Sequence, residues 1–184
     1  MNHYYTDEIN TLILVSLLKK HNIKKIIASP GTTNISFVGS VQIDSYFEVY
    51  SAVDERSAAF MACGLSEESG ESVVLTCTGA TASRNYIPGL TEAYYRHLPI
   101  LAITSTQHTG RVGNYVAQVI DRSEVFPDSI KKSIQLPTVY SEEDKQHTIT
   151  VVNEAILELT HGAAGPVHIN LTTTYSNNFV VKEL

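Results

Sequence analysis

A carboxylate at the junction of a predicted strand and a predicted helix is the residue of this chain best placed to do chemistry. Residues 49–53 read Val-Tyr-Ser-Ala-Val, which is typical of a short strand, and Asp54 after them is a good helix N-cap. Glu55 then falls on the first turn of a helix at the carboxyl end of a strand, the edge at which open parallel α/β sheets bind ligands. The spacing alone does not distinguish two roles for Glu55. It could contact a ligand, or it could only complement the positive end of the helix dipole.

Two tight turns could bring a ligand close to the backbone at the same edge. Pro30-Gly31 ends a predicted strand over residues 24–29, and Thr78-Gly79 ends a nearly continuous apolar run. Glycine has no Cβ, so another group can approach its backbone closely. An ordinary strand-terminating turn is the alternative for both positions.

Helices and strands alternate along the whole chain. Several of the strands read as apolar runs rather than alternating patterns, which indicates burial on both faces and therefore a parallel sheet covered by helices. We predict an α/β fold with a doubly wound, mostly parallel six-stranded sheet and helices on both faces. The predicted helices span residues 7–21, 34–41, 55–70, 80–96 and 141–162, and the predicted strands span residues 24–29, 49–53, 72–78, 99–105, 132–136 and 167–171.

Local end signals support the first and the last of these helices. Thr6 can cap the first helix, and Glu8 suits its positive end. Ser141 and Asp144 resemble a capping box at the start of the last helix. The apolar residues of that helix recur at helical spacing and should share one buried face: Val152, Ala155, Ile156 and Leu159.

The composition is that of an ordinary globular domain. The chain has 184 residues, which is enough for one domain with a sizeable core, and its net charge of −6 argues against a nucleic-acid binder. No apolar run approaches the ~20 residues of a membrane span, and the polar N-terminus lacks a signal-peptide pattern. Cys63 and Cys77 have no neighbours at metal-ligand spacing, which favours two buried, reduced thiols. We therefore expect a soluble, cytoplasmic protein.

Several short motifs occur in the order and spacing of one known module. Each motif is weak alone, but the ordered set covers essentially the whole chain. It resembles the pyrimidine-binding (PYR, N-terminal) domain of thiamine diphosphate-dependent enzymes, the group containing acetolactate synthase, SEPHCHC synthase and 2-oxoacid decarboxylases. Ser-Pro-Gly and Asp-Glu-Arg are most similar to motifs of SEPHCHC synthases. The full set is Ser29-Pro30-Gly31, Asp54-Glu55-Arg56-Ser57-Ala58, Cys77-Thr78-Gly79-Ala80, Asn85-Tyr86 and Gly165-Pro166-Val167-His168-Ile169-Asn170-Leu171.

The resemblance implies a catalytic role for Glu55. In these enzymes a glutamate at this position contacts the N1′ nitrogen of the cofactor's aminopyrimidine ring and shares a proton with it, which activates the cofactor. The cofactor supplies the carbanion chemistry, and the protein supplies orientation and proton control. The resemblance assigns cofactor contacts to Pro30, Gly31, Glu55, Thr78, Gly79 and Asn85, and substrate contacts to Thr32 and Gln118.

Some of these candidates have simpler alternatives. Gln118 could be a solvated loop amide, and Asn85 could be a surface residue. Unperturbed histidine titrates in a range useful for acid–base chemistry. We nevertheless expect His97 and His108 to be surface or structural residues, and His168 to be a packed core residue of the final strand.

The chain departs from the SEPHCHC synthase pattern at positions that hold a polyanionic substrate. Thr32 and Thr33 stand where that enzyme has a residue pair that includes an arginine, and Gln107 is the nearest match to a second arginine. Arginine pairs with carboxylates through two hydrogen bonds at once, so losing both argues against that substrate. Three other arginines could compensate from elsewhere in the chain: Arg84, Arg111 and Arg122.

Half of the expected active site is missing from the sequence. Enzymes of this group hold the diphosphate through Mg²⁺ in a second domain, which carries a Gly-Asp-Gly motif followed by an asparagine, and the chain contains no such motif. We therefore predict a single PYR domain over residues 1–184 with no metal site of its own, inactive alone and weak in binding thiamine diphosphate. Its partner would be a diphosphate-binding domain, either in the same polypeptide or as a separate subunit.

This assignment predicts an aminopyrimidine-binding half of a 2-oxoacid decarboxylase or carboligase. The enzyme would be a homodimer or homotetramer acting on a small 2-oxoacid, and the small residues 58–64 could form an interface helix. The alternative is a non-catalytic α/β binding or assembly domain that has kept the fold without the chemistry. A nucleotide-binding Rossmann domain is disfavoured because no Gly-x-Gly-x-x-Gly follows the first strand.

Overall fold

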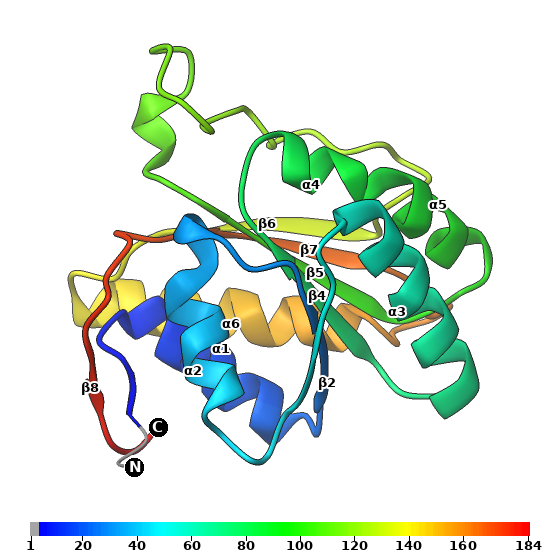
Figure 1. Cartoon of the computed structure of the whole chain (residues 1–184), viewed down its shortest axis with the longest axis horizontal. Helices are drawn as coiled ribbons and strands as arrows, with labels where there is room; N and C mark the ends of the chain where they lie inside the picture. Colours follow the sequence, from blue (N-terminus) through cyan, green and yellow to red (C-terminus); the bar gives the residue numbers. More distant parts are fainter. Residues whose placement is uncertain (1–3) are drawn as a thin grey trace.

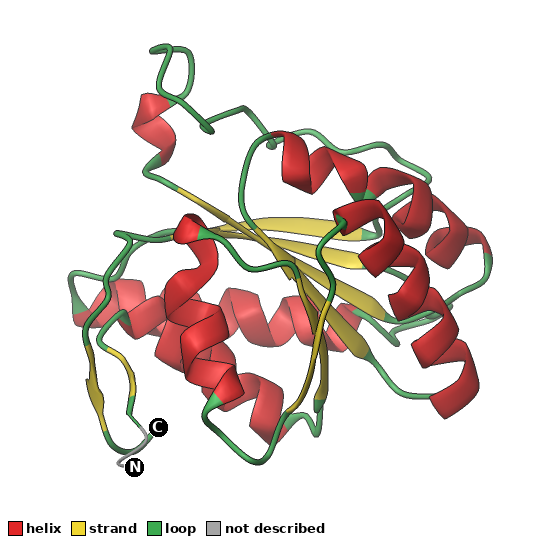
Figure 2. Ribbon diagram, viewed as in Figure 1, coloured by secondary structure: helices red, strands yellow, loops and turns green. Residues whose placement is uncertain are grey.

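A parallel sheet of six strands forms the centre of the molecule, and a separate pair of antiparallel strands lies beside it (Figures 1 and 2). The computed structural model describes residues 4–184. The helices are α1 (Ile9–Lys20), α2 (Ile35–Gln42), α3 (Glu55–Ser69), α4 (Thr81–Asn85), α5 (Ile87–Tyr95) and α6 (Glu142–Glu158), with short 3-10 turns η1 (Thr32–Asn34) and η2 (Thr109–Arg111). The strands are β1 (Tyr5–Thr6), β2 (Lys25–Ala28), β3 (Glu48–Ser51), β4 (Val73–Cys77), β5 (Ile100–Thr106), β6 (Lys132–Leu136), β7 (Val167–Thr172) and β8 (Phe179–Val181).

The six central strands run in the order β3-β2-β4-β5-β7-β6, and every neighbouring pair is parallel. Because the strands are parallel, their carboxyl ends all meet at one edge of the sheet. The predicted doubly wound α/β fold with six strands is confirmed. β3 and β6 are the two outer strands, and each has one neighbour in the sheet.

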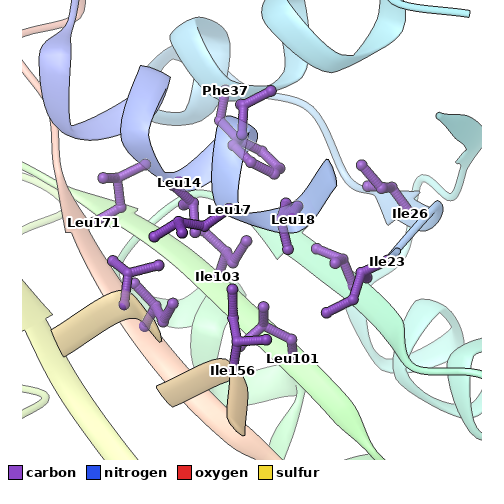
Figure 3. Close-up of a cluster of buried hydrophobic side chains, with 14 of the residues drawn as sticks. Leu14, Leu17, Leu18, Ile23, Ile26, Phe37, Leu101, Ile103, Ile156 and Leu171 are labelled. Carbon is purple, nitrogen blue, oxygen red and sulfur yellow. The ribbon is translucent and has the colours of Figure 1, made fainter. Parts of the chain in front are cut away.

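Successive residues of the buried strands point to opposite faces and so contribute to two separate cores. Ile26 of β2 joins the core beneath α1, α2 and α6, which also contains Leu14 and Phe37 (Figure 3). Ile27, the next residue, joins the core beneath α3 and α5 together with Leu90. Both faces of the sheet are therefore covered by helices, as the apolar strand pattern predicts.

The small residues of α3 are used inside the chain. Ala58, Ala59 and Ala62 are buried in the core that α3 shares with α5. A Cβ added at Gly89 of α5 would overlap Ala59, so the two helices can approach this closely only because both positions are small. These three alanines pack within the chain, whereas Gly64 is exposed, and the expectation that residues 58–64 form an interface helix stays a prediction.

Most helix ends lie where their capping signals predict. The Asp54 carboxylate accepts a hydrogen bond from the Ser57 amide at 2.7 Å, which caps α3. Gly70 ends the same helix with a left-handed φ of 68°. Ser141 and Asp144 form the predicted capping box, each side chain accepting a hydrogen bond from the other's backbone amide, at 3.1 Å and 3.0 Å.

Two predicted helices differ from the structure in detail. The single helix predicted over residues 80–96 is two helices that meet at Tyr86. Pro88 has no amide hydrogen to bond the carbonyl four residues before it, so a continuous helix cannot form there. The first helix begins at Ile9, and Thr6 does not cap it: the Thr6 hydroxyl instead accepts a hydrogen bond from the Glu8 amide at 3.3 Å.

The connections around β2 and β4 create the place where a ligand can bind. After β2 the chain enters α2 on one face of the sheet, whereas after β4 it enters α4 and α5 on the opposite face. Because β2 and β4 are neighbours, the chain leaves them towards opposite faces at the carboxyl edge, the place where open α/β sheets bind ligands. This part of the edge is the topological switch point of the sheet.

Candidate functional site

Glu55 lies at the carboxyl edge of the sheet, as predicted. It is the first residue of α3, immediately after the Asp54 cap, and its side chain is partly exposed. Its negative charge acts on two buried groups across from it, Cys77 at the end of β4 and Tyr86 between α4 and α5. The carboxylate therefore faces the carboxyl end of β4 and is still accessible from outside.

The turn after β2 closes against the turn after β4. A Cβ at Gly31 would overlap the Thr78 methyl group, so glycine is required for this close approach. The Asn34 side chain fixes the turn, accepting from the Gly31 amide at 2.7 Å and donating to the Ser29 carbonyl at 3.2 Å. Pro30, Gly31 and Thr32 line one pocket of about 520 Å³ beside this turn.

The turn after β4 contacts the polar loop that follows β5. A Cβ at Gly79 would lie 2.9 Å from the Ser105 carbonyl oxygen and 3.1 Å from the Gln118 carbonyl oxygen. Ala80 and Gln118 both have a positive φ, of 57° and 64°, which non-glycine residues rarely adopt. Such strain in non-glycine residues collects at functional sites and points to a role for this turn. The predicted residues Gly79 and Gln118 are thus brought together.

Buried hydroxyl groups without hydrogen-bond partners line the same edge. Tyr86 is 1% exposed, and its hydroxyl lies near Cys77 and Ser29 without a well-aligned hydrogen bond to either. The hydroxyls of Ser29 and Ser105 are also buried and unpartnered among the described residues. Burial raises the pKa of Tyr86 well above its usual value and the pKa of Cys77 to about 12, and the charge of Glu55 adds to both shifts.

Glu55 is the residue of this edge that fits the aminopyrimidine ring of thiamine diphosphate, because its carboxylate is partly exposed and can meet a ring nitrogen. Gly31 and Gly79 serve close contacts within the chain, since their Cβ positions face the Thr78 methyl group and the carbonyl oxygens of Ser105 and Gln118. Asn85 ends the short helix α4 and is only partly buried, whereas Tyr86 beside it is buried near Cys77 and Ser29.

A ladder of buried polar side chains crosses β5, β7 and β6 next to this edge. His168 contacts the Thr104 hydroxyl through Nε2 and the Ser133 hydroxyl through Nδ1, each at 2.8 Å. Since Thr104 donates its own proton to Asn170 at 3.3 Å, it can only accept from Nε2–H, and Nδ1 then accepts from Ser133. Burial lowers the pKa of His168 to about 3, helped by the charges of two arginines, so the ring is neutral at pH 7. The prediction of a packed core histidine is confirmed.

The neutral His168 should make the chain sensitive to mild acid. Its pKa is 6.5 when unfolded and about 3 when folded, so only the unfolded chain takes up this proton between those values. The stabilisation is therefore complete above pH 6.5. It is lost as the pH falls, by up to about 1.4 kcal/mol in unfolding free energy per pH unit. Urea unfolding at pH 7, 6 and 5 measures this slope, which His168→Gln should flatten and the exposed-site control His147→Gln should not. A wild-type stability that stays constant from pH 7 to 5 would contradict the assignment.

The remaining titratable candidates lie outside the site. His97 and His108 are exposed, as expected. Both cysteines are free and buried, which confirms the predicted reduced thiols. Within residues 4–184 no group of three His, Cys, Asp or Glu side chains could hold a metal ion, and no helix there is long and apolar enough to cross a membrane.

Three buried groups at this edge are absent from the predicted site, namely Tyr86, Ser29 and Arg122. Arg122 is 5% exposed, and all three of its guanidinium nitrogens lack hydrogen-bond partners among the described residues. In the sequence Arg122 is one of three arginines in polar surroundings, and nothing in its neighbours predicts burial. The two hydroxyl residues belong to recognised motifs, but only the fold shows that they face one another.

Comparison with known proteins identifies the family. Residues 11–125 match the family described as thiamine pyrophosphate enzyme, N-terminal TPP binding domain. A 2-succinyl-5-enolpyruvyl-6-hydroxy-3-cyclohexene-1-carboxylate synthase of Phocaeicola vulgatus is 40% identical over 167 residues, 91% of this chain and 30% of that protein. The synthase of the same name from Porphyromonas gingivalis is 33% identical over 176 residues, 94% of this chain and 30% of that protein.

A solved structure agrees with the fold. The thiamine diphosphate-dependent 4-hydroxybenzoylformate decarboxylase of Rhodococcus jostii RHA1 superimposes with a TM-score of 0.77 at 22% identity, over 95% of this chain and 31% of that one. The chain thus spans about a third of the length of the proteins it matches. The six-stranded parallel sheet and the match over residues 11–125 lead to one conclusion: the chain belongs to the thiamine pyrophosphate enzyme family and represents its N-terminal TPP-binding domain.

Proposed function

We propose that this chain binds the aminopyrimidine ring of thiamine diphosphate and supplies Glu55 as the proton partner of that ring. The observation that carries the proposal is the position of Glu55, a partly exposed carboxylate at the switch point, close enough for its charge to raise the pKa values of Cys77 and Tyr86. A carboxylate there can hold a proton against a ring nitrogen, which is the role a glutamate has in enzymes of this family. When bound, the cofactor supplies the carbanion chemistry.

The other residues of the edge position the ring and keep water away. Cys77 and Tyr86 stay neutral at pH 7, so Glu55 faces uncharged neighbours and is the group that exchanges a proton. Gly31 and Gly79 let the loops after β2, β4 and β5 pack closely together, and these packed loops are proposed to position the ring. Thr32 and Gln118 border this edge and are proposed to face the substrate.

A second domain is proposed to complete the site. Residues 1–184 would form one PYR domain, and a diphosphate-binding domain, in the same polypeptide or as a separate subunit, would hold the diphosphate through Mg²⁺. A homodimer or homotetramer would bring the two kinds of domain together. This chain matches only 30% of the length of its relatives, which supports the proposal that a second domain completes the site.

The proposed reaction is decarboxylation of a small 2-oxoacid followed by carbon–carbon bond formation. The relatives are named for a product with a succinyl and a carboxylate group, so that compound is the first product to test. The replacement of two expected arginines by Thr32 and Gln107 leaves the substrate to be decided by experiment.

Calorimetric titration with thiamine diphosphate and Mg²⁺ tests the proposal. The complete protein, with its diphosphate-binding domain, should bind the cofactor and release CO₂ from a 2-oxoacid, whereas the isolated 184-residue chain should bind it at least about a hundredfold more weakly. Tight binding by the isolated chain would contradict the division of the site. Binding without turnover in the complete protein would favour the alternative, a non-catalytic α/β binding or assembly domain.

A further inference from the structure

Arg122 is a buried cation without a counter-ion. Its side chain is 5% exposed, and its Nε and both terminal nitrogens have no hydrogen-bond partner in the part of the chain that the structure describes. Burial lowers the pKa of Arg122 to about 10, so the group still carries its charge at pH 7. Leaving a buried charge unpaired is costly, and proteins retain such groups where a ligand provides the partner.

The surroundings of Arg122 make the local potential positive. Arg84 lies close enough for its charge to oppose that of Arg122, and it donates a hydrogen bond to the Asp121 carbonyl at 2.8 Å. The two other titratable neighbours, Cys77 and His168, are uncharged at pH 7. Asp121 is the nearest acidic residue in sequence, but its carboxylate is exposed and accepts from Ser123 at 2.9 Å and 2.7 Å.

Arg122 also lines the wall of a polar pocket at the carboxyl ends of β5, β7 and β6. The pocket has a volume of about 440 Å³, enough for a small organic acid. Thr106, Ser133, Gln135 and Asn170 supply hydroxyl and amide groups to the same wall. One terminal nitrogen of Arg122 would lie 3.3 Å from a Cβ at Gly79, so the pocket adjoins the turn that is proposed to hold the cofactor ring.

We propose that Arg122 anchors a carboxylate of a small organic acid in this pocket. The inference rests on the proposed function for the identity of the ligand as substrate, but the binding itself requires neither cofactor nor turnover. The guanidinium nitrogens lie beneath the pocket wall, so the side chain must turn outward to form its two parallel hydrogen bonds with the carboxylate.

This role predicts an unusual combination of effects for Arg122→Met. The substitution removes the charge and leaves an unbranched apolar side chain that ends near the position of the arginine Nε. The ligand-free chain should therefore melt higher, by roughly 2–4 °C or more. The same substitution should weaken binding of the dicarboxylate succinate by about tenfold or more. A guanidinium that only stabilises the fold would produce the opposite change in melting temperature and no change in succinate binding.

The test uses the 184-residue chain without cofactor, at constant ionic strength. Succinate is titrated while NMR follows backbone amide signals of the pocket residues in every variant, and also the Arg122 Nε–H signal where Arg122 is present. The uncharged dimethyl succinate is the matched control ligand. Arg96→Met is the control variant, because Arg96 pairs with Glu67 and Glu92 on the exposed side of the molecule. Arg122→Lys keeps the charge but cannot form the two parallel hydrogen bonds of a guanidinium. It provides a second variant if Arg122→Met does not fold.

The expected result is a shift of the Arg122 signal with succinate and none with its diester, at a Kd below about 10 mM. Arg96→Met should bind like the wild type, and Arg122→Lys should bind more weakly. The proposal is overturned if the wild-type chain does not bind succinate in this range, or if Arg122 variants bind it as well as the wild type does. Failure of cofactor binding in the complete protein would count against the proposed function and leave this result unaffected.

Discussion

Glu55→Gln is expected to lower kcat of the complete enzyme by about 10²–10⁴-fold, the usual range for losing a positioned proton-transfer group. Glutamine has the size and hydrogen-bonding reach of glutamate but cannot exchange a proton at the ring nitrogen. The fold should be unaffected, because the side chain is partly exposed at the start of α3 and Asp54 supplies the helix cap. Steady-state kinetics at saturating cofactor, together with thermal melting, measures both effects.

Glu68→Gln is the matched control for this experiment. Glu68 lies on the same helix, exposed and far along it from the carboxyl edge of the sheet. Its substitution removes one carboxylate from the same helix and leaves the residues of the switch point unchanged, so kcat should remain within about twofold of the wild type. Near-normal turnover in the Glu55 variant would rule out the proposed proton transfer.

Glu8→Ala is expected to destabilise the chain by about 1–3 kcal/mol. The Glu8 carboxylate is 8% exposed and accepts hydrogen bonds from the Ser36 hydroxyl at 2.8 Å and from the Thr174 amide and hydroxyl, both at 2.7 Å. Removing it leaves the buried Ser36 hydroxyl without this partner and breaks the link between α2 and Thr174 in the segment after β7. Urea unfolding at pH 7 measures the loss.

Glu124→Ala provides the control, since Glu124 is an exposed loop carboxylate. Its replacement should change the unfolding free energy by no more than about 0.5 kcal/mol. If Glu8→Ala costs as little as the control does, the carboxylate does not hold the two segments together.

The order of helices and strands could be predicted because each element carries its own signal. The apolar runs of β4, β5 and β7 indicate burial on both faces, and the structure places each of them inside the sheet. Ser141 with Asp144 and Asp54 with Ser57 form the caps that their spacing indicates. Such contacts join residues close in sequence, so local patterns are sufficient to predict them.

Features that depend on distant contacts could not be predicted. The antiparallel pair of β1 and β8 joins opposite ends of the described chain and comprises only two and three residues. Glu8 was expected to complement a helix dipole, but its carboxylate binds Ser36 and Thr174 instead. Only the fold brings these residues together.

The sequence predicts the location of the candidate site at the carboxyl edge of the sheet, but not which side chains contact one another there. Placing Glu55, Gly31 and Gly79 at strand ends follows from the parallel sheet, since all strands end at one edge. The proximity of Glu55 to Tyr86 joins the first turn of α3 to the junction of α4 and α5, which lie far apart in sequence. The burial of Arg122 depends on the path of a long irregular loop, for which the sequence has no periodic signal.

The outer strands of the sheet restrict how this molecule can associate. β3 is only four residues long and has Glu48 exposed, and β6 carries Lys132, which pairs with Glu154 at 2.9 Å. Short, charged edges discourage a neighbouring copy from adding its own strand and starting a fibril. Self-association through continuous β-structure is therefore disfavoured, and a stable oligomer must be built through helices and loops.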